Sequence, residues 1–587
     1  MKPLAPEESP APATGGEPRH LGDTALLALA TAGIVVAGLG AYPLWGPDEG
    51  RHAEIARRLG EAGSWLVPRV YGAPYYDKPV LFYWILRSSF ALFGVSELAA
   101  RLPSAIAAIA TVVLIHRFAL PRIGRRGAAA ASLVLATAPL AVVFGRFCNL
   151  DATLCLLITA ACLAWLSWLE APRAGPPWGA YLAMGLGTLL KGPVAIALPA
   201  LMAAAVALAD GRPFALLRRA GPIRGALVVA AVAVPWYAAA AVADPDYVRT
   251  FLVEHNFHRY VSPTFVHARS PLYFAAVLPG VLLPWPLIVP AALGVEPARG
   301  RARRAERDAL LWAAVVVVFF SIGRAKLPSY VLPAVPAIAL WLGSRLARLG
   351  PDQGQRLRLA VAAWAGLLAA AAVALPIYAW LSYPDLVAPS LGGAAAAVVA
   401  LGGLRLAWRR PEVAATPLLA ASTAALFAAF YLGAAPAISP YASDVALARA
   451  AALRPGIPAV AFRVQPATFS FYSGRIVPRI DSLEEMRERL RAGPLLVVTR
   501  RRQLGDLAAA GATLRPWADN GRHLLLGTEP RPRPGRSSPD EARSNQPPCS
   551  SSKLTRSSAC SSSTARMPSS MRRVVGSSLP RYWIISR

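Results

Sequence analysis

Long apolar runs separated by short charged turns are the feature that most limits how this chain can fold. Thirteen candidate segments start near residues 24, 97, 127, 150, 178, 193, 225, 271, 309, 330, 359, 388 and 413. Each is roughly 15 to 22 residues long, which is close to the length that crosses the hydrocarbon layer as a helix. Hydrophobic residues make up 55% of the chain and charged residues only 16%. The sequence therefore predicts an α-helical polytopic membrane protein with about 13 transmembrane helices.

Arginine clusters follow every second apolar run and set the expected orientation of the chain. The clusters fall near residues 117–126, 173, 212–224, 299–307, 345–358 and 405–410. Basic residues are enriched in cytoplasmic loops, so residues 1–23 and all six clusters are predicted to be cytoplasmic. The net charge of +29 is explained by these short clusters, and their placement between apolar runs argues against nucleic acid as a partner.

The first loop on the opposite face, residues 45–96, is long and rich in aromatic residues. Asp48 to Leu59 has a helical rhythm with Pro47 at its start. Trp and Tyr side chains favour the headgroup level of a bilayer. We therefore predict amphipathic interfacial helices in this loop, lying over the helices of a membrane domain that extends over residues 24–436.

A different composition begins near residue 437. The stretches GIPAVAFRV and GPLLVVTRR are typical of strands, and DSLEEMRERLRAG is typical of a helix with acids in its first turn and Gly at its end. Residues 437–529 are predicted to form a small α/β domain outside the cytoplasm. Residues 530–587 are rich in Ser and Arg and too polar to bury a core, so we expect a disordered tail.

Asp48 and Glu49 directly follow the first apolar run, beneath the aromatic loop. Acids at a helix start complement the helix dipole, and this structural explanation stays open. It does not explain why two acids adjoin a membrane segment. The functional explanation is a carboxylate at the membrane boundary that orients or deprotonates an acceptor.

The other candidates, seven charged residues and one tyrosine, fall in loops on the face opposite the arginine clusters. They are Asp77, Lys78, Arg146, Asp151, Lys191, Arg259, Lys326 and Tyr330. Lysine suits a phosphate as a point charge. Cations that converge over a lipid-embedded bundle indicate an anionic lipid headgroup, most simply a phosphate. An ion pair between Arg146 and Asp151 is an equally good explanation for those two residues.

Two further alternatives remain open at this stage. Glu254, His255 and His258 have only a weak metal-ligand spacing, so a divalent metal ion held by Asp77 and His255 is a minor alternative, and no cofactor is otherwise indicated. The same cations would also suit a transporter or flippase for anionic polyprenyl-linked lipids. A flippase needs polar residues along its path, whereas the runs 193–209 and 359–380 are almost unbroken Ala, Val and Leu.

Several motifs together resemble those of C-superfamily membrane glycosyltransferases, in the aminoarabinose (lipid A) transferase and protein mannosyltransferase-related group. The motifs are GPDEGRHAEIARRLGEAGSWLVPRVYGAPYYDKPVLFYW, RFCNLDATL, LLKGP, EHNFHRY and KLPSYVLPAVPA. The resemblance covers roughly residues 24 to 530. It departs from the usual pattern at DKPV, where a second Pro is common.

The resemblance implies transfer of a sugar from a polyprenyl (undecaprenyl) phosphate donor to a lipid A, glycan or protein acceptor of the envelope. The site would face the periplasm from a bacterial inner membrane. In such proteins the first-loop acid matching Asp48 is the key carboxylate, Lys78 contacts the carrier phosphate, and Asp151 supports the site. Lys191, Arg259 and Tyr330 would complete the phosphate pocket. With Glu49 as a second catalytic candidate, these residues define the site that the sequence predicts.

Overall fold

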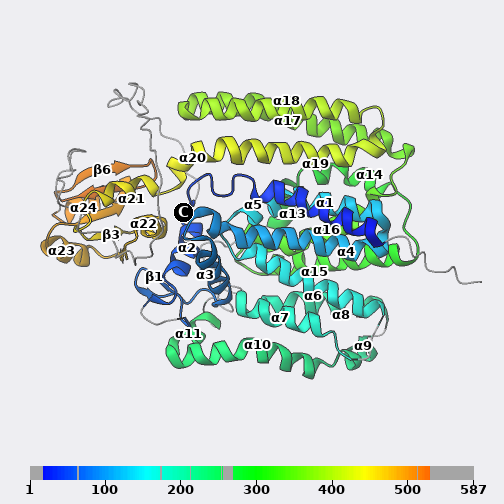
Figure 1. The fold of residues 1–587 in the computed structure, drawn as a ribbon, viewed down its shortest axis with the longest axis horizontal. Helices are drawn as coiled ribbons and strands as arrows, with labels where there is room; N and C mark the ends of the chain where they lie inside the picture. Colours follow the sequence, from blue (N-terminus) through cyan, green and yellow to red (C-terminus); the bar gives the residue numbers. More distant parts are fainter. Residues whose placement is uncertain are drawn as a thin grey trace, which may run out of the picture. The chain divides into compact units, whose positions relative to one another are not determined.

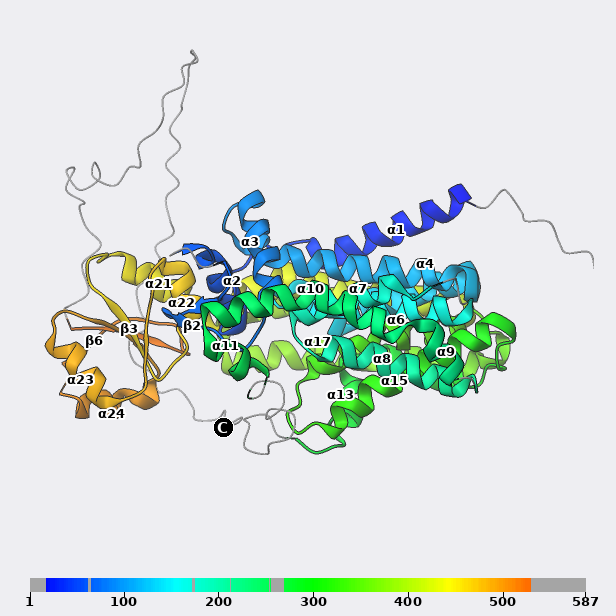
Figure 2. The ribbon, with the colours of Figure 1, turned by 90° about the horizontal axis from the view of Figure 1, so that it is seen from below.

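A computed structural model describes residues 17–61, 65–171, 175–211, 213–252, 254, 269–511 and 513–528 of the chain. Residues Met1–Arg531 belong to one compact unit. Within it, long helices run side by side, and a strand-containing region lies beside α2 (Asp48–Arg58) at one end of them, as Figures 1 and 2 both show. The predicted tail, residues 530–587, lies outside the described residues.

Most of the described chain is helical. The helices before residue 300 are α1 (Glu17–Val36), α4 (Glu97–Thr137), α5 (Pro139–Arg146), α6 (Asp151–Glu170), α7 (Trp178–Leu190), α8 (Val194–Ala209), α9 (Pro213–Ala220), α10 (Pro222–Ala243), α11 (Pro245–Arg249), α13 (Tyr273–Val281), η3 (Trp285–Ile288) and α14 (Val289–Leu293). Those that follow, up to residue 442, are α15 (Gly300–Ile322), η4 (Pro328–Ala334), α16 (Val335–Leu346), η5 (Pro351–Gln353), α17 (Gly354–Ser382), η6 (Pro384–Leu386), α18 (Val387–Ala407), α19 (Pro411–Ala429), η7 (Phe430–Ala434) and α20 (Ala435–Ala442).

Six of the described helical segments are long and apolar enough to cross a membrane: Glu97–Thr137, Asp151–Glu170, Arg218–Ala243, Pro328–Leu346, Pro351–Ser382 and Pro411–Ala442. The pair Tyr273–Val281 and Trp285–Leu293, bent by 94°, would make a seventh. The chain is thus a multi-pass membrane protein, but the predicted total of thirteen spans is not confirmed. Several predicted segments form shorter apolar helices, such as α7 with 13 residues and α8 with 16, because Gly192 and Pro193 interrupt the chain between them.

The second and third predicted segments both fall in α4, which turns sharply at Gly124. That residue has φ 73° and ψ 173°, a backbone conformation that glycine adopts far more readily than other residues. Arg122 and Arg125 lie at this turn. Arg122 contacts Glu170 at the end of α6 (2.5 Å), and Arg125 pairs with Asp23 of α1. The turn therefore joins three segments at one end of the bundle.

Other arginines of the predicted cytoplasmic clusters form ion pairs with acidic residues of neighbouring segments. Arg304 and Arg307 of α15 contact Asp210 at the end of α8 (2.6 and 2.7 Å). Arg348, after α16, contacts Glu306 of α15 (2.5 Å). Figure 1 shows α9, which follows Asp210, at the opposite end of the long helices from α2 and α3 (Leu81–Phe93). These contacts agree with the predicted separation of arginine clusters and candidate site residues onto two faces.

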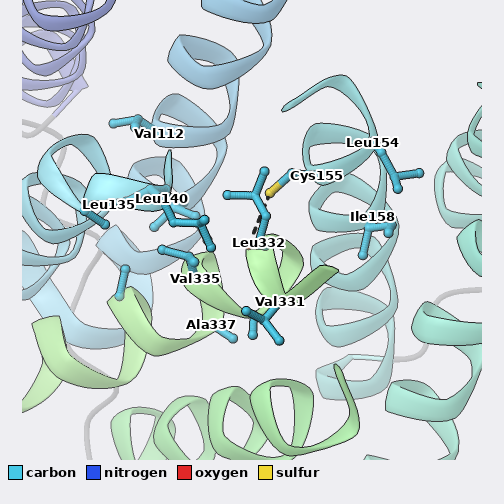
Figure 3. Close-up of a cluster of buried hydrophobic side chains, with 14 of the residues drawn as sticks. Val112, Leu135, Leu140, Leu154, Cys155, Ile158, Val331, Leu332, Val335 and Ala337 are labelled. Atoms are coloured by element: carbon cyan, nitrogen blue, oxygen red, sulfur yellow. Dashed lines mark hydrogen bonds between the residues drawn. The ribbon is translucent and has the colours of Figure 1, made fainter. Parts of the chain in front are cut away.

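The apolar core joins α4 and α6 to η4 and the start of α16. Figure 3 shows Val112 and Leu135 of α4 close to Leu332 and Val335. The Sγ of Cys155 in α6 donates to the Leu332 carbonyl (3.6 Å). These side chains are buried, so they fix the relative positions of the helices whose ends carry the candidate site.

The first loop contains the predicted helix, which is α2, and its interfacial position stays a prediction. A two-stranded antiparallel pair, β1 (Arg69–Val70) and β2 (Ala73–Pro74), and the helix α3 follow it. Gly50 of α2 packs against α22 (Ala467–Ser473). A Cβ on Gly50 would lie 2.5 Å from the Cα of Thr468 and 2.7 Å from its backbone nitrogen, so glycine is required for this close approach.

The strand-containing region has a five-stranded sheet of order β4-β3-β5-β7-β6. β3 pairs in parallel with β4 and β5, and β7 pairs antiparallel with β5 and β6. Its elements are α21 (Val445–Ala452), β3 (Ala459–Phe462), α22, β4 (Arg479–Ile480), α23 (Leu483–Arg491), β5 (Leu496–Thr499), η8 (Arg501–Gln503), α24 (Leu504–Ala509), β6 (Arg515–Asp519) and β7 (Leu524–Gly527).

The two strands and the helix expected from the sequence of this region are confirmed as β3, β5 and α23. Ser482 caps α23 by accepting a hydrogen bond from the Glu485 backbone N–H (3.1 Å). The region belongs to the same compact unit as the helices. Its predicted independence as a domain over residues 437–529 stays a prediction.

Candidate functional site

A cavity of about 430 Å3 brings together five of the predicted site residues from four separate segments. They are Asp77, Lys78, Asp151, Lys191 and Tyr330. The rest of the described lining is mainly apolar and includes Ile158, Leu198, Leu252, Phe319 and Phe320. The cavity is therefore amphipathic, with charged groups contributed by helix ends and an apolar wall contributed by helix sides.

Lys191 and Asp151 form an ion pair at this cavity. Asp151 is the first residue of α6 and is buried, and Lys191 ends α7 with a side chain that is 19% exposed. The Lys191 Nζ also lies 5.7 Å from the centre of the Tyr330 ring, within the range of a cation–π contact. Asp151 thus pairs with Lys191, and the alternative pairing with Arg146 is not seen.

Lys78 is half-buried and contributes its ammonium from the first loop. Its Nζ donates to the Asp77 carbonyl (2.8 Å), and the Tyr247 hydroxyl of α11 donates to the Lys78 carbonyl (2.5 Å). Pro79 follows and restricts the backbone further. The main chain at Lys78 is therefore held from both sides while its side chain lines the cavity.

His52 of α2 is a buried histidine that lies near the positive charges of this cavity. The ring is buried, and its Nδ1 lies 3.2 Å from the Tyr83 hydroxyl. Burial lowers the pKa of His52 well below 6.5, and the positive charges of Arg51, Lys78 and Lys191 lower it further. His52 is therefore neutral at physiological pH.

Asp48 does not belong to the described lining of the cavity. It pairs with Arg51, and its side chain is 47% exposed. The Arg51 guanidinium lies 5.9 Å from the centre of the buried Tyr75 ring. Burial raises the pKa of Tyr75, Arg51 opposes that rise, and the charges of Asp77 and Asp48 add to it. Arg51 and Tyr75 thus link Asp48 to the cavity residue Asp77.

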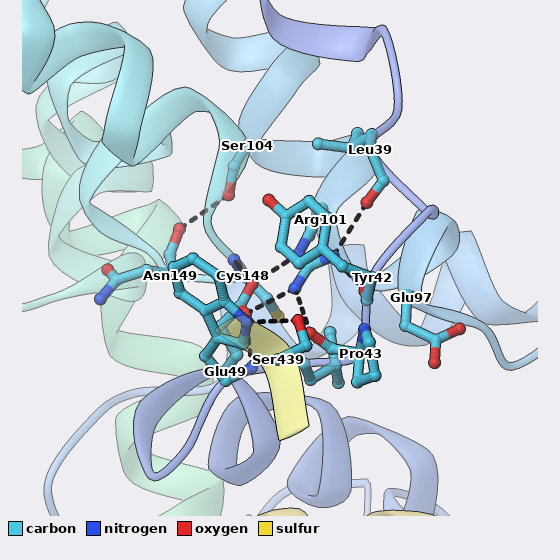
Figure 4. Close-up of polar contacts among 12 residues, drawn as sticks. Leu39, Tyr42, Pro43, Glu49, Glu97, Arg101, Ser104, Cys148, Asn149 and Ser439 are labelled. Atoms are coloured by element: carbon cyan, nitrogen blue, oxygen red, sulfur yellow. Dashed lines mark hydrogen bonds and ion pairs between the residues drawn. The ribbon is translucent and has the colours of Figure 1, made fainter. Parts of the chain in front are cut away.

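Glu49 has a different environment from its neighbour Asp48, and Figure 4 shows it beside Arg101 and Cys148. Its carboxylate is buried and accepts two hydrogen bonds from the Arg101 guanidinium (2.7 Å each). It also accepts from the backbone N–H groups of Trp45 (2.8 Å) and Cys148 (2.9 Å). Every lone-pair direction is used, which leaves no room for a substrate. These contacts do not support the prediction that Glu49 is catalytic and favour a structural role.

Arg146 and Lys326 are also placed away from the described lining of the cavity. Arg146 is buried and donates to the carbonyls of Ile34 and Ala37 (2.7 Å each), which fastens α5 to the end of α1. Lys326 is 2% exposed, and its Nζ donates to the carbonyls of Gly323 and Arg269. Both predictions of a phosphate contact are unsupported, because these side chains are occupied by backbone oxygens.

Arg259 and His255 lie outside the described residues, so their predicted roles remain predictions. Among the residues that the structure describes, no group of three or more His, Cys, Asp or Glu side chains is arranged to hold a metal ion. A divalent metal at Asp77 and His255 therefore also remains a prediction.

Three residues that support the site escaped the sequence interpretation. His52, Arg51 and Tyr247 pack around the cavity residues, but each belongs to an ordinary local pattern. His52 and Arg51 fit the amphipathic rhythm of α2, and Tyr247 is a single aromatic residue in a short helix. Arg51 and His52 lie two and three residues after Glu49, and Tyr247 lies in a loop predicted on the same face; the sequence offers no other signal.

Comparison with known proteins supports the group suggested by the motifs. Residues 77–238 match the family model for dolichyl-phosphate-mannose-protein mannosyltransferase. The chain is 33% identical over 327 residues to the undecaprenyl phosphate-alpha-4-amino-4-deoxy-L-arabinose arabinosyl transferase of Serratia proteamaculans, covering 54% of this chain and 58% of that protein. The transferase of the same name from Edwardsiella ictaluri is 32% identical over 345 residues, covering 57% and 62%.

Solved structures extend this similarity over most of the chain. The apo crystal structure of ArnT from Cupriavidus metallidurans has a TM-score of 0.75 and 26% identity, and the match covers 87% of this chain and 98% of that one. The family resemblance is confirmed. In sequence and fold the chain is similar to C-superfamily membrane glycosyltransferases of the aminoarabinose transferase type. A second structure of the Cupriavidus protein, bound to undecaprenyl phosphate, matches with a TM-score of 0.74, 26% identity, and coverage of 86% and 98%.

The sequence matches to the curated relatives are partial. The chain spans 58% and 62% of the lengths of the two aminoarabinose transferases described above. The matched family model begins at Asp77 and therefore includes Lys78, Asp151 and Lys191, but not Asp48. Asp77, Lys78, Asp151 and Lys191 of the cavity thus lie within the matched range, whereas Tyr330 lies outside it.

Proposed function

We propose that this chain is a membrane glycosyltransferase that moves a sugar from a polyprenyl phosphate donor to an acceptor on the extracytoplasmic face. The observation that carries the proposal is the amphipathic cavity with Lys78 and Lys191 at its polar side. A polyprenyl phosphate has matching chemistry, with one anionic group on a long apolar chain. The Cupriavidus structure bound to undecaprenyl phosphate supports this choice of donor.

In this proposal the two lysines hold the carrier phosphate. The bond between the anomeric carbon and the phosphate oxygen breaks during transfer, and the phosphate leaves with the bonding electrons. Fixed cations stabilise the negative charge that develops on the leaving oxygen more than they stabilise the bound donor. Asp151 positions the Lys191 ammonium for this task through their ion pair.

Asp48 acts on the acceptor in this proposal. An acceptor oxygen attacks the anomeric carbon, and the half-exposed carboxylate of Asp48 orients the attacking group or takes its proton. If the acceptor is itself a phosphate, no proton needs to be removed, and Asp48 then stabilises the positive charge that develops on the sugar. Either role requires a carboxylate rather than an amide.

The orientation follows from the arginine clusters. We infer that their end of the bundle is cytoplasmic, so the cavity and the strand-containing region face the periplasm of a bacterial inner membrane. The names of the curated relatives make aminoarabinose the first sugar to test. Lipid A or another envelope glycan or protein is the proposed acceptor.

The test compares two lysine variants in the purified full chain, reconstituted in nanodiscs of zwitterionic lipid. Lys78→Met should weaken binding of undecaprenyl phosphate and slow sugar transfer from the corresponding sugar-linked donor. Lys326→Met is the matched control, because that ammonium contacts backbone carbonyls and does not line the cavity. Its folded fraction should bind the donor as the wild type does.

Three results would count against the proposal. Equal loss of donor binding in both lysine variants would place the phosphate elsewhere. Absence of undecaprenyl phosphate binding in the wild type would remove the donor. Movement of the lipid between leaflets without any sugar transfer would favour the flippase alternative.

A further inference from the structure

A second, strongly basic cavity lies in the strand-containing region, apart from the donor cavity. It has a volume of about 270 Å3 and is lined by Arg463, Gln465, Arg479, Arg500, Arg522 and His523, together with Val464. Pro47 of the first loop completes the described lining. The volume exceeds the roughly 30 Å3 that one water molecule occupies in the liquid, so a polyatomic ligand fits. None of these residues has a role in the proposed transfer.

The four arginines differ in how their charges are balanced. Arg463 contacts Asp506 (2.7 Å) and Arg479 contacts Asp481 (3.0 Å), so each has a carboxylate partner. The Arg522 guanidinium donates to the Gly46 carbonyl (2.9 Å), which carries no net charge. Within the described part of the chain, the Arg500 guanidinium makes no hydrogen bond or ion pair. Among the described residues, the Arg500 and Arg522 guanidinium groups therefore make no ion pair with a carboxylate, although Asp444 lies near enough to attract Arg500.

His523 adds a buried group with an unused nitrogen. The residue is 4% exposed, and its Nδ1 lies 2.9 Å from the Asp444 carboxylate, which also accepts from Asn520 (3.0 Å). Its Nε2 is buried with no hydrogen-bond partner among the described residues. Buried polar atoms in folded proteins almost always have a partner, so an unpaired nitrogen in the wall of a basic cavity indicates a missing ligand.

We propose that this cavity is a binding site for a phosphate group, held by Arg500, Arg522 and His523. Guanidinium groups match the oxygens of a phosphate in geometry and charge. The His523 ring lies between Asp444 at its Nδ1 and the unpartnered Nε2, which is the nitrogen left to contact the anion. Burial lowers the pKa of Arg500, repulsion by Arg502 and Arg522 lowers it further, and attraction by Asp444 opposes part of this change. A bound anion would relieve that repulsion.

The phosphate site adjoins the first loop, so a bound phosphate would affect how this loop is held. The Gly46 N–H donates to the Ala442 carbonyl (3.0 Å), and its carbonyl accepts from Arg522. Arg51, the partner of Asp48, reaches Gln465 in the cavity wall (3.5 Å). A phosphate held here would therefore bind on the side of α2 that carries Asp48, and it would join the first loop to the sheet.

The experiment measures phosphate binding to the full chain in nanodiscs of phosphatidylcholine by calorimetry. One arm uses inorganic phosphate, and the other adds phosphatidic acid, a lipid with a phosphate monoester headgroup. Arg500→Gln should weaken binding at least about tenfold, because a charge-assisted hydrogen bond is lost. His523→Asn should also weaken it. Arg489→Gln is the matched control, since Arg489 is an exposed arginine of α23 outside the described lining.

The two arms identify the source of the phosphate. Binding of phosphatidic acid alone assigns a lipid headgroup, binding of inorganic phosphate alone assigns the free ion, and binding of both assigns the shared group. Equal binding by the wild type and Arg500→Gln would overturn the proposal, as would equal loss in Arg489→Gln.

Two further measurements keep this site separate from the donor cavity and from misfolding. Lys78→Met should leave phosphate binding here unchanged, so a failed donor assignment would not affect the result. The thermal unfolding midpoint of wild type should rise on adding phosphate, and that rise should be lost in Arg500→Gln. Without phosphate the variant should unfold no earlier than wild type, because Arg500 has no partner to lose among the described residues.

Discussion

Asp48 and Glu49 are neighbours in the chain, yet they belong to two kinds of charged region. Glu49 is buried and accepts four hydrogen bonds, two of them from the buried Arg101. Asp48 is half-exposed and has a single ion pair with Arg51. The first region is a closed network, and the second lies beside an open cavity whose lysines have room for a ligand.

The difference shows how a membrane protein uses charges of the same type for structure and for chemistry. A buried carboxylate with every oxygen satisfied holds elements together, because removing either partner leaves an uncompensated charge. Arg101 also donates to the carbonyls of Leu39, Tyr42 and Pro43, so it ties the end of the first helix to α4. Charged groups at the cavity stay partly exposed to water, and a substrate can replace that water.

The largest effect is expected at the closed network. Glu49→Gln would leave the Arg101 guanidinium buried without its negative partner, so we expect a loss of roughly 3–5 kcal/mol in the free energy of unfolding. Arg101→Met should be similarly destabilising. The measurement is the thermal unfolding midpoint of the detergent-solubilised protein, with size-exclusion chromatography to follow aggregation.

Glu61→Gln is the matched control for this change. Glu61 pairs with Arg58, but its side chain is 52% exposed, so the pair contributes little. If Glu49→Gln folds as stably as Glu61→Gln, the network does not have the structural role that separates it from the cavity.

The second effect concerns the neighbouring acid. Asp48→Asn makes the same chemical change one residue earlier, and we expect turnover to fall by about 100-fold while the unfolding midpoint and donor binding stay near wild type. Steady-state transfer assays, with donor binding measured separately, would check this. Wild-type turnover in Asp48→Asn would mean that Asp48 is only a helix-end acid.

Local patterns in the sequence predicted the individual elements well. The α2 helix, the strands β3 and β5, and the capped helix α23 all have residues whose own periodicity and end signals favour those structures. The convergence of Lys78, Asp151, Lys191 and Tyr330 on one cavity also followed from topology, because each lies in or beside a loop predicted on the face opposite the arginine clusters.

Partner choice was harder to predict, because it depends on contacts between distant segments. Nothing near Glu49 in sequence shows that Arg101, 52 positions later, fills its pocket. Arg146 had a nearby acid in Asp151 but instead binds carbonyls of α1, which expose unpaired oxygens at a helix end. The number of membrane crossings was also uncertain from hydropathy, since Gly and Pro divide apolar runs into short helices.

The third effect is smaller and lies within the cavity. Lys191→Met removes one of the two ammonium groups at the cavity. In the wild type, the negative charge of Asp151 already balances part of the attraction between Lys191 and the donor phosphate. We therefore expect donor affinity to fall by about tenfold, the loss of one charge-assisted contact. Lys191→Arg should recover part of it. Titration of undecaprenyl phosphate against each variant is the measurement, and unchanged affinity in Lys191→Met would leave Lys78 as the main phosphate ligand.

The smallest effect is a pH dependence that comes from the burial of His52 in α2 and from the positive charges near it. His52 has a folded-state pKa well below 6.5 because it is buried and lies near Arg51, Lys78 and Lys191. In the unfolded chain it takes up a proton near its ordinary pKa, so the unfolded state binds more protons below that pH. The stability that neutral His52 allows is therefore present above about pH 6.5 and decreases as pH falls, by about 1 kcal/mol between pH 6.5 and 5.5.

His52→Asn isolates this contribution, because an amide does not titrate and can keep a hydrogen bond to the Tyr83 hydroxyl. The variant should have a lower free energy of unfolding than the wild type at pH 7.5. This difference should decrease by about 1 kcal/mol by pH 5.5, because only the wild type loses the His52 contribution. Chemical unfolding curves at several pH values would measure the two slopes, and other titrating groups cancel in their difference. Parallel slopes would show that His52 takes up its proton in the folded protein as readily as in the unfolded chain. In that case neither burial nor the nearby charges of Arg51, Lys78 and Lys191 would keep His52 neutral, and the contrast with the closed network around Glu49 would be weaker.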